Sequence, residues 1–260
     1  MREPDQRIKQ LRAGKLSIEI YPDRNAAAEA AAQKAADALI DLAQTRESVG
    51  VIFATGASQL EMLSALTAIP NLRWDRVIGF HLDEYVGIDV DHPASFRGYL
   101  RKNLIEKIAI KKFYELDGSK PAIQEQCKQY ASHVRAADPQ LCLLGVGENG
   151  HLAFNDPGEA DFNDPLDVKV VHLDEVCRQQ QAAEGWFKSL DDVPTLALTL
   201  TIPTIFRVPQ LILSVPGKRK ATIVRRMLEE EISAQCPATI LRTHPNAVVH
   251  LDLDSAGQLL

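Results

Sequence analysis

The chain lacks several features that would place it in particular protein classes. It has only four cysteines in 260 residues, far apart and without a CxxC pair. They therefore offer neither a disulfide framework nor the ligand spacing of a metal site, and we interpret them as buried, reduced thiols. No apolar run approaches the roughly 20 residues of a membrane span. The N-terminus has no apolar segment typical of a secretory signal, so we expect a cytoplasmic protein.

Long basic runs are also absent. Lys and Arg number 29 against 35 Asp and Glu, which gives a net charge of −6. This balance argues against nucleic acid as the main partner. It leaves room for an anionic small molecule, because a site can be locally positive on an acidic protein. The sequence does not decide between a monomer and a homo-oligomer.

Segments typical of strands and of helices alternate along the chain. Hydrophobic residues make up 45% and charged residues 25%, the ordinary globular range. Strands are expected at 16–20, 50–54, 77–80, 113–116, 141–144, 168–173, 196–202, 211–215 and 248–251, and helices at 24–46, 59–68, 92–108, 121–137, 174–187 and 216–232. This alternation predicts an α/β fold with an open, mostly parallel, doubly wound sheet. Without a repeat or linker, residues 1–260 are expected to form one domain, with residues 1–14 frayed.

The most informative stretch is residues 141–158, LCLLGVGENGHLAFNDPG. A short apolar run with the character of a buried strand ends in a glycine-rich turn, and polar residues follow at once. Ligands bind at the carboxyl ends of strands in open parallel sheets. His151, with Asn149 and Asp156 nearby, is therefore a candidate acid/base group.

Two strands end in a glycine turn that opens a helix. In the first, residues 55–58 read TGAS, and such a turn presents free backbone N–H groups to a phosphate. The alternative is that Thr55 or Ser58 merely caps the helix. No Gly-Lys-Ser/Thr follows, so this is not a P-loop. In the second, residues 216–220 read PGKRK, which is either a solvated basic turn or an anion site with a lysine as point charge.

Two adjacent carboxylates, Asp83 and Glu84, follow the strand at 77–80. At such a place carboxylates are often solvated or capping rather than catalytic. Neighbouring side chains on an extended backbone point to opposite sides. At most one of the two should therefore face a given pocket.

Several segments together resemble the glucosamine-6-phosphate deaminase (glucosamine-6-phosphate isomerase) family, in the superfamily shared with 6-phosphogluconolactonase. They are TGAS at 55–58, FHLDEYVGI at 80–88, HPASF at 92–96, GVGENGHLAFNDPG at 145–158, PGKRKA at 216–221 and LRTHPNA at 241–247. The match runs in order over nearly the whole chain. It implies a modified Rossmann-like fold. It also implies a hydrolase that converts glucosamine 6-phosphate and water to fructose 6-phosphate and ammonia, with no metal or organic cofactor.

The resemblance also implies roles for individual residues. Asp83 matches the catalytic aspartate and His151 the ring-opening histidine, while Asn149 and Asp156 match polar positions around that histidine. Four residues match the family's phosphate site: Gly56, Ala57, Ser58 and Lys220. We add three neighbouring residues as candidates for substrate binding: Thr55, Glu84 and Gly150.

The residue types suit this chemistry. A shielded carboxylate can move a proton between adjacent carbons, as an aldose–ketose isomerisation requires. An imidazole such as that of His151 can move the proton at the ring oxygen near neutral pH. Its second nitrogen needs an orienting partner, for which Asp156 and Asn149 are the candidates.

The chain departs from the family pattern at three places. Asp156 is one methylene shorter than the family glutamate, and Asn149 lacks the charge that would raise the basicity of the histidine. The family's phosphate arginine falls on Glu184, and Arg178 is the nearest arginine that could replace it. Residues 158–168 are short of the basic residues used for allosteric activation in some members.

Three functions remain open at this point. An amino-sugar-phosphate deaminase, for glucosamine or an epimer, is favoured by FNDP after the GH histidine and by the intact DEY segment. A 6-phosphogluconolactonase would share the fold and the phosphate turn, but it should have a different segment after GH and fits the DEYVG segment poorly. A non-catalytic sugar-phosphate sensor is favoured by the altered arginine and by Asp156 in place of glutamate, and is opposed by retention of Asp83 and His151.

Overall fold

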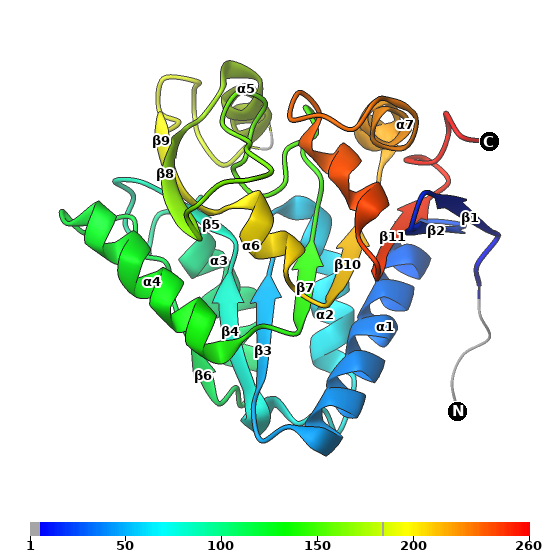
Figure 1. The fold of residues 1–260 in the computed structure, drawn as a ribbon, viewed down its shortest axis with the longest axis horizontal. Helices are drawn as coiled ribbons and strands as arrows, with labels where there is room; N and C mark the ends of the chain where they lie inside the picture. Colours follow the sequence, from blue (N-terminus) through cyan, green and yellow to red (C-terminus); the bar gives the residue numbers. More distant parts are fainter. Residues whose placement is uncertain (1–5, 184) are drawn as a thin grey trace.

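A computed structural model describes residues 6–183 and 185–260, and its centre is an eight-stranded sheet (Figure 1). The strand order is β1-β2-β11-β10-β7-β3-β4-β6. The bounds are β1 Lys9–Ala13, β2 Leu16–Tyr21, β11 Ala247–Asp252, β10 Gln210–Ser214, β7 Leu141–Leu144, β3 Val49–Phe53, β4 Val77–His81 and β6 Lys112–Phe113. All neighbours are parallel except the antiparallel pair β1 and β2. The mostly parallel sheet predicted from the sequence is confirmed.

Helices cover both faces of this sheet (Figure 1). One face packs against α1 (Arg24–Thr45), α2 (Leu60–Ala68) and α3 (Phe96–Asn103). The other packs against α4 (Ile123–Ala137), α6 (Ile202–Phe206) and α7 (Ala221–Glu229). Alternate side chains of β7 enter the two apolar clusters, so this strand is buried on both sides as its uninterrupted apolar run predicts.

A second, three-stranded sheet lies beyond the carboxyl ends of the parallel strands (Figure 1). It consists of β5 (Asp83–Tyr85), β9 (Leu196–Leu200) and β8 (Val168–His172), paired antiparallel in the order β5-β9-β8. The sequence predicted the strands at 168–173 and 196–202 but not this separate sheet. The strand expected at 196–202 ends at Leu200, because the short helix α6 begins at Ile202 with Pro203 in its first turn.

The first residues differ from the expectation of a frayed segment. Residues 1–5 lie outside the described part of the chain, but residues 9–13 form β1, which pairs with β2 along its whole length. Gly14 turns the chain between them with a φ of +58°, a conformation that suits glycine. The pairing extends the sheet and ties this segment down.

The remaining helices are short. α5 covers Glu175–Ala183, within the longer helix expected at 174–187. Single 3₁₀ turns are η1 Ala57–Gln59, η2 Trp74–Arg76, η3 Ile105–Lys107 and η4 Lys218–Lys220, and a longer 3₁₀ segment is η5 Pro237–Thr243. None of the described helices is long and apolar enough to cross a bilayer.

Candidate active site

A pocket opens where the carboxyl ends of β3 and β7 meet the second sheet and α5. Its lining includes seven residues singled out in the sequence: Thr55, Gly56, Ala57, Ser58, Asp83, His151 and Lys220. They come from four separate strand ends or turns. Carboxyl ends of parallel strands converge on one edge of a sheet, which explains why such distant segments share a pocket.

The turn at residues 55–58 leads from β3 into η1 and α2. Gly56 has φ +99° and ψ 167°, a conformation essentially confined to glycine. Its carbonyl is held by the Tyr99 hydroxyl at 2.9 Å. Among described residues, no acceptor takes the N–H groups of Gly56, Ala57 and Ser58. Neither η1 nor α2 has a side-chain cap, so the capping alternative for Thr55 and Ser58 is wrong and the N–H groups are available to an anion.

Gln59, which sequence reasoning did not single out, supports this turn from behind. Its side chain is fully buried, and Nε2 donates to Ser58 Oγ at 3.0 Å and to the Ser214 carbonyl at 3.1 Å. A Cβ on Gly145 would lie only 2.9 Å from that nitrogen. Because Ser58 Oγ accepts from Gln59, its own hydrogen remains to be donated to a ligand.

Lys220 brings a positive charge to the pocket from the end of η4. It is buried, and its Nζ donates to the Val146 carbonyl at 2.8 Å. Lys218 and Arg219 on the same turn are exposed, and Arg219 pairs with Glu148 at 3.1 Å. The solvated-turn alternative therefore describes these two cations but not Lys220.

Asp83 lies on β5, beside Thr199 of β9, and its side chain enters the pocket. The carboxyl group is buried. Burial raises the pKa of Asp83 well above its usual range, and the negative charges of Glu84 and Asp156 raise it further. A carboxylate of this kind is a stronger base than one in water.

Glu84 does not reach the pocket, which corrects its assignment as a substrate-binding residue. It is fully buried on the opposite side of β5, as the alternation of an extended strand requires. Its oxygens accept hydrogen bonds of 3.0 to 3.1 Å from Tyr85, Ser95, Phe96 and Arg97. Burial raises the pKa of Glu84 although these donors oppose the shift. The residue anchors β5 to the start of α3.

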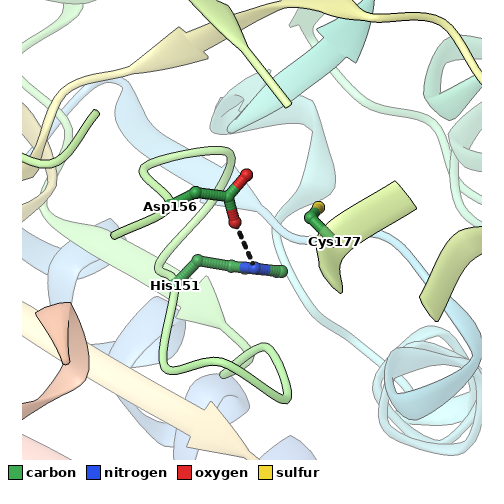
Figure 2. A group of neighbouring side chains, drawn as sticks. All are labelled: His151, Asp156 and Cys177. Carbon is green, nitrogen blue, oxygen red and sulfur yellow. Dashed lines mark ion pairs between the residues drawn. The ribbon is translucent and has the colours of Figure 1, made fainter. Parts of the chain in front are cut away.

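His151 lies against Asp156 in the loop that follows β7 (Figure 2). Its Nδ1 is 2.9 Å from Asp156 Oδ1. Burial disfavours the charge of Asp156, but contacts with His151 and Asn149 outweigh it and lower the pKa of this carboxyl. A Cβ on Gly147 would lie 2.2 Å from the imidazole, so only glycine permits this position of the ring.

Asn149 orients this pair and does not line the pocket. Its Nδ2 donates to Asp156 Oδ1 at 2.9 Å and to Asp174 Oδ2 at 3.0 Å, while its Oδ1 accepts from the His151 N–H at 3.0 Å. Asp174 was not anticipated. It also accepts from the Cys177 N–H at 2.6 Å and so joins the start of α5 to the histidine loop.

Gly150 and Arg178 are not in the pocket, which corrects both assignments. Gly150 has φ +94°, and a Cβ there would lie 2.8 Å from the Cys236 sulfur, so its role is to let the loop pack closely. Arg178 donates instead to the carbonyls of Leu190 and Val193, at 2.7 and 3.1 Å. Those backbone acceptors hold its guanidinium away from the glycine turn at residues 55–58.

Two glutamines of α5 line the pocket instead, and sequence reasoning missed both. Gln180 accepts from the Glu148 N–H at 3.1 Å, and Gln181 accepts from the Tyr85 hydroxyl at 2.7 Å. The RQQQ run carried a signal, because consecutive amides can pair with backbone and hydroxyl groups while facing a ligand. Glu184, which stands at the family's arginine position, lies outside the described residues.

The chain matches the family model described as glucosamine-6-phosphate isomerases/6-phosphogluconolactonase over residues 22–250. A glucosamine-6-phosphate deaminase of Bacillus cereus is 35% identical over 215 residues, covering 83% of this chain and 80% of that protein. One from Bacillus anthracis is 34% identical with the same coverage.

Solved structures show the same likeness. A monomeric glucosamine-6-phosphate deaminase superposes with a TM-score of 0.84 at 29% identity, covering 93% of this chain and 99% of that one. A 6-phosphogluconolactonase from Thermotoga maritima gives a TM-score of 0.75 at 20% identity, covering 92% and 100%. The second likeness shows a shared fold.

Proposed function

The chain belongs to the family of glucosamine-6-phosphate isomerases and 6-phosphogluconolactonases, and from that premise we propose that it is an amino-sugar-phosphate deaminase. The reaction is the conversion of glucosamine 6-phosphate and water to fructose 6-phosphate and ammonia. One observation carries the proposal: the carboxyl of Asp83 and the imidazole of His151 share a pocket with the anion turn at 55–58. The 35% identity to a glucosamine-6-phosphate deaminase supports it further.

The phosphate is held at the end of the pocket formed by the anion turn and Lys220. The free N–H groups at 56–58, the Ser58 hydroxyl and the Lys220 ammonium supply the donors. A phosphate fixed there positions the sugar carbons without taking part in the chemistry.

The imidazole of His151 moves the proton at the ring oxygen, and the sugar opens to its aldehyde form. Its Nδ1 lies beside Asp156, whose lowered pKa keeps a negative charge next to the ring. This negative charge stabilises the imidazolium that forms when the imidazole of His151 accepts a proton. Asn149 holds the Asp156 carboxylate in place.

Asp83 then moves a proton between the aldehyde carbon, C1, and its neighbour C2. Its carboxylate takes the proton from C2 and returns it to C1, while one proton of the amino group passes to the C1 oxygen. This leaves a hydroxyl at C1 and a C=N bond at C2. Water hydrolyses this imine to the ketone, and ammonia leaves. The raised pKa of Asp83 strengthens the base for the first step.

Ammonia release from glucosamine 6-phosphate tests the proposal, with galactosamine 6-phosphate and 6-phosphogluconolactone assayed beside it. We expect ammonia and fructose 6-phosphate from the first. Asp83→Asn should abolish turnover while inorganic phosphate still binds, since the anion turn is untouched. Hydrolysis of the lactone without ammonia release would establish the alternative enzyme, and binding without turnover of any substrate would establish a sensor.

The acid limb of the pH profile tests the role of Asp83 separately. The base must be ionised to accept a proton, and its pKa is raised above the ordinary value of 3.8. Activity should therefore be lost, as the pH falls, at a higher pH than an ordinary aspartate would give. A kcat/KM that stays flat down to pH 4 would contradict this assignment.

The proposal extends to organisation and location: one α/β domain that works in the cytoplasm on a small sugar phosphate. Two apolar clusters that share the strands of one sheet support a single domain. Four buried free cysteines are typical of a reducing compartment and support the location.

A further inference from the structure

Three side chains with metal-binding atoms converge beside His151, the only one of them that lines the pocket (Figure 2). His151, Asp156 and Cys177 each offer one such atom, and these atoms lie within 4.8 Å of one another. All three residues are buried. Among the residues that the structure describes, no other trio of His, Cys, Asp or Glu brings its ligand atoms together in this way.

The histidine nitrogen in this group lies directly against a carboxylate. His151 Nδ1 is buried and forms an ion pair with Asp156 Oδ1 at 2.9 Å. Such a nitrogen at close range to a carboxylate oxygen is suited to share a cation with it. Cys177 approaches the same place from the first turn of α5, as Figure 2 shows.

Imidazole, carboxylate and thiolate are the three ligand types that Zn²⁺ prefers in proteins. Two of them are anionic when the metal binds, so Asp156 and Cys177 together offset its double charge. Burial and the neighbouring carboxylates, chiefly Asp156 and Asp174, raise the pKa of the Cys177 thiol, so a bound metal has to displace its proton. The same negative surroundings attract a cation. Three protein ligands leave one position of a tetrahedral site for water.

We propose that His151, Asp156 and Cys177 form a binding site for Zn²⁺, and that zinc bound there inhibits the enzyme reversibly. The inhibition rests on the proposed deaminase function, whereas the metal site does not. Binding forms a sulfur–zinc bond and releases the thiol proton of Cys177 to water, with no change in oxidation state. The metal occupies His151 and its carboxylate partner, so the imidazole no longer exchanges the proton at the ring oxygen.

Cys177 makes the proposal testable, because it belongs to the metal site but has no part in the proposed chemistry. Cys177→Ser keeps the size and a polar hydrogen while replacing the soft thiolate ligand. Without metal, this variant should turn over substrate as the unaltered protein does. Zinc should inhibit it at least about tenfold less effectively, because even the loss of a partner outside the ligand shell costs roughly 10–100-fold in metal affinity.

Co²⁺ reports the site independently of activity. A cobalt–thiolate bond gives a charge-transfer absorption in the near ultraviolet, so titrating the full chain with Co²⁺ should produce this band with one ion per chain. Zn²⁺ should displace it, and Cys177→Ser should lack it. Cys236→Ser is the matched control, because Cys236 is also buried and lies beside the same loop, against Gly150. That variant should keep both the band and the inhibition.

Two results would overturn the proposal: no thiolate band in the unaltered protein, or equal zinc inhibition of the Cys177→Ser and unaltered proteins. Should Cys177→Ser fail to fold, the cobalt–thiolate band of the unaltered protein and the displacement of Co²⁺ by Zn²⁺ still test whether the metal site exists. A cobalt band in a protein that turns over no amino-sugar phosphate would support the metal site and contradict the deaminase function, so the two failures are distinguishable.

Discussion

Two segments on either side of β7 have the same backbone plan. Each runs from a five-residue strand through a glycine into a three-residue 3₁₀ turn and a nine-residue helix: β3–Gly56–η1–α2 and β10–Gly217–η4–α7. The two glycines have nearly equal dihedral angles, φ 99° and ψ 167° against φ 94° and ψ 151°. In the sheet, β3 and β10 are the two neighbours of β7.

The two units differ in what meets the turn. The Gly217 N–H donates to both oxygens of Asp252, at 3.0 and 2.9 Å, so the chain fills this anion site with its own carboxylate. The Gly56 unit has no such acceptor among described residues and lines the pocket. A glycine turn at a helix start is therefore only the framework of an anion site, and a neighbouring side chain decides whether a ligand can use it.

The third residue of each 3₁₀ turn reaches toward the middle of the sheet. Gln59 of the first unit contacts the end of β10, and Lys220 of the second contacts the loop after β7. The first unit thus supplies neutral donors, while the second supplies the charge. The candidate site therefore combines the neutral donors of the Gly56 unit with the lysine of the Gly217 unit.

Among changes to the two units, the largest effect is expected from removing the charge of Lys220. Lys220→Ala should raise KM for the phosphorylated substrate about tenfold or more, because hydrogen bonds to charged groups are worth about 1.5–3 kcal/mol. Kcat should change less, since the contact is far from the reacting carbons. Lys218→Ala removes the same charge from an exposed position two residues away and should leave KM unchanged. Equal KM values for the two variants would contradict the assignment of Lys220.

Alanine substitutions at the two glycines should lower the stability of the fold to a similar extent but differ in their effect on substrate binding. Both Gly56→Ala and Gly217→Ala introduce a side chain at positive φ, at a cost of about 1–3 kcal/mol each. Urea unfolding should show similar losses of stability. Steady-state kinetics should show a several-fold higher KM for Gly56→Ala and little change for Gly217→Ala. A larger rise in KM for Gly217→Ala than for Gly56→Ala would contradict the assignment of the Gly56 turn as the phosphate site.

Gln59→Met should weaken substrate binding by a smaller amount. It preserves the length of the side chain but no longer donates to Ser58, a loss of about 0.5–1.5 kcal/mol. KM should rise several-fold. If Gln59 acts through the Ser58 hydroxyl, its effect should shrink in a Ser58→Ala background, which a double-mutant cycle measures. Full additivity would show that the two residues act separately.

The smallest effect on turnover is expected from Asp252→Asn. The Gly217 N–H then loses a charged acceptor, so thermal unfolding should occur at a lower temperature. KM should stay the same, because the pocket at Gly56 is not involved. A raised KM would show that the second turn also contacts substrate.

The sequence was sufficient to predict groups that directly follow strands. Thr55, Asp83, His151 and Lys220 all lie in segments that follow the ends of parallel strands, and the convergence of such ends in a parallel sheet is a general property. Their shared pocket could therefore be predicted without knowing any contact. The buried run at 141–144 likewise identified a central strand.

Residues that act through partners far along the chain could not be predicted. Gln59 and Ser214 are 155 positions apart, and no local pattern links them. Arg178 was misassigned for the same reason: the carbonyls of Leu190 and Val193 hold its side chain, and their position depends on the tertiary fold. The antiparallel sheet escaped prediction because its strands alternate like any others, whereas their pairing is set by contacts distant in sequence.

The anchoring of Glu84 has a consequence for the chemistry on the other side of β5. Pairing with β9 sets which of two adjacent acids looks into the pocket, and a slip of one position would exchange them. Glu84 accepts hydrogen bonds from four residues, Tyr85, Ser95, Phe96 and Arg97, so this slip would break every one of those bonds. The alternation of side chains along a three-residue strand thus selects which acid faces the pocket, and the side chain that fixes this choice is not part of the pocket lining.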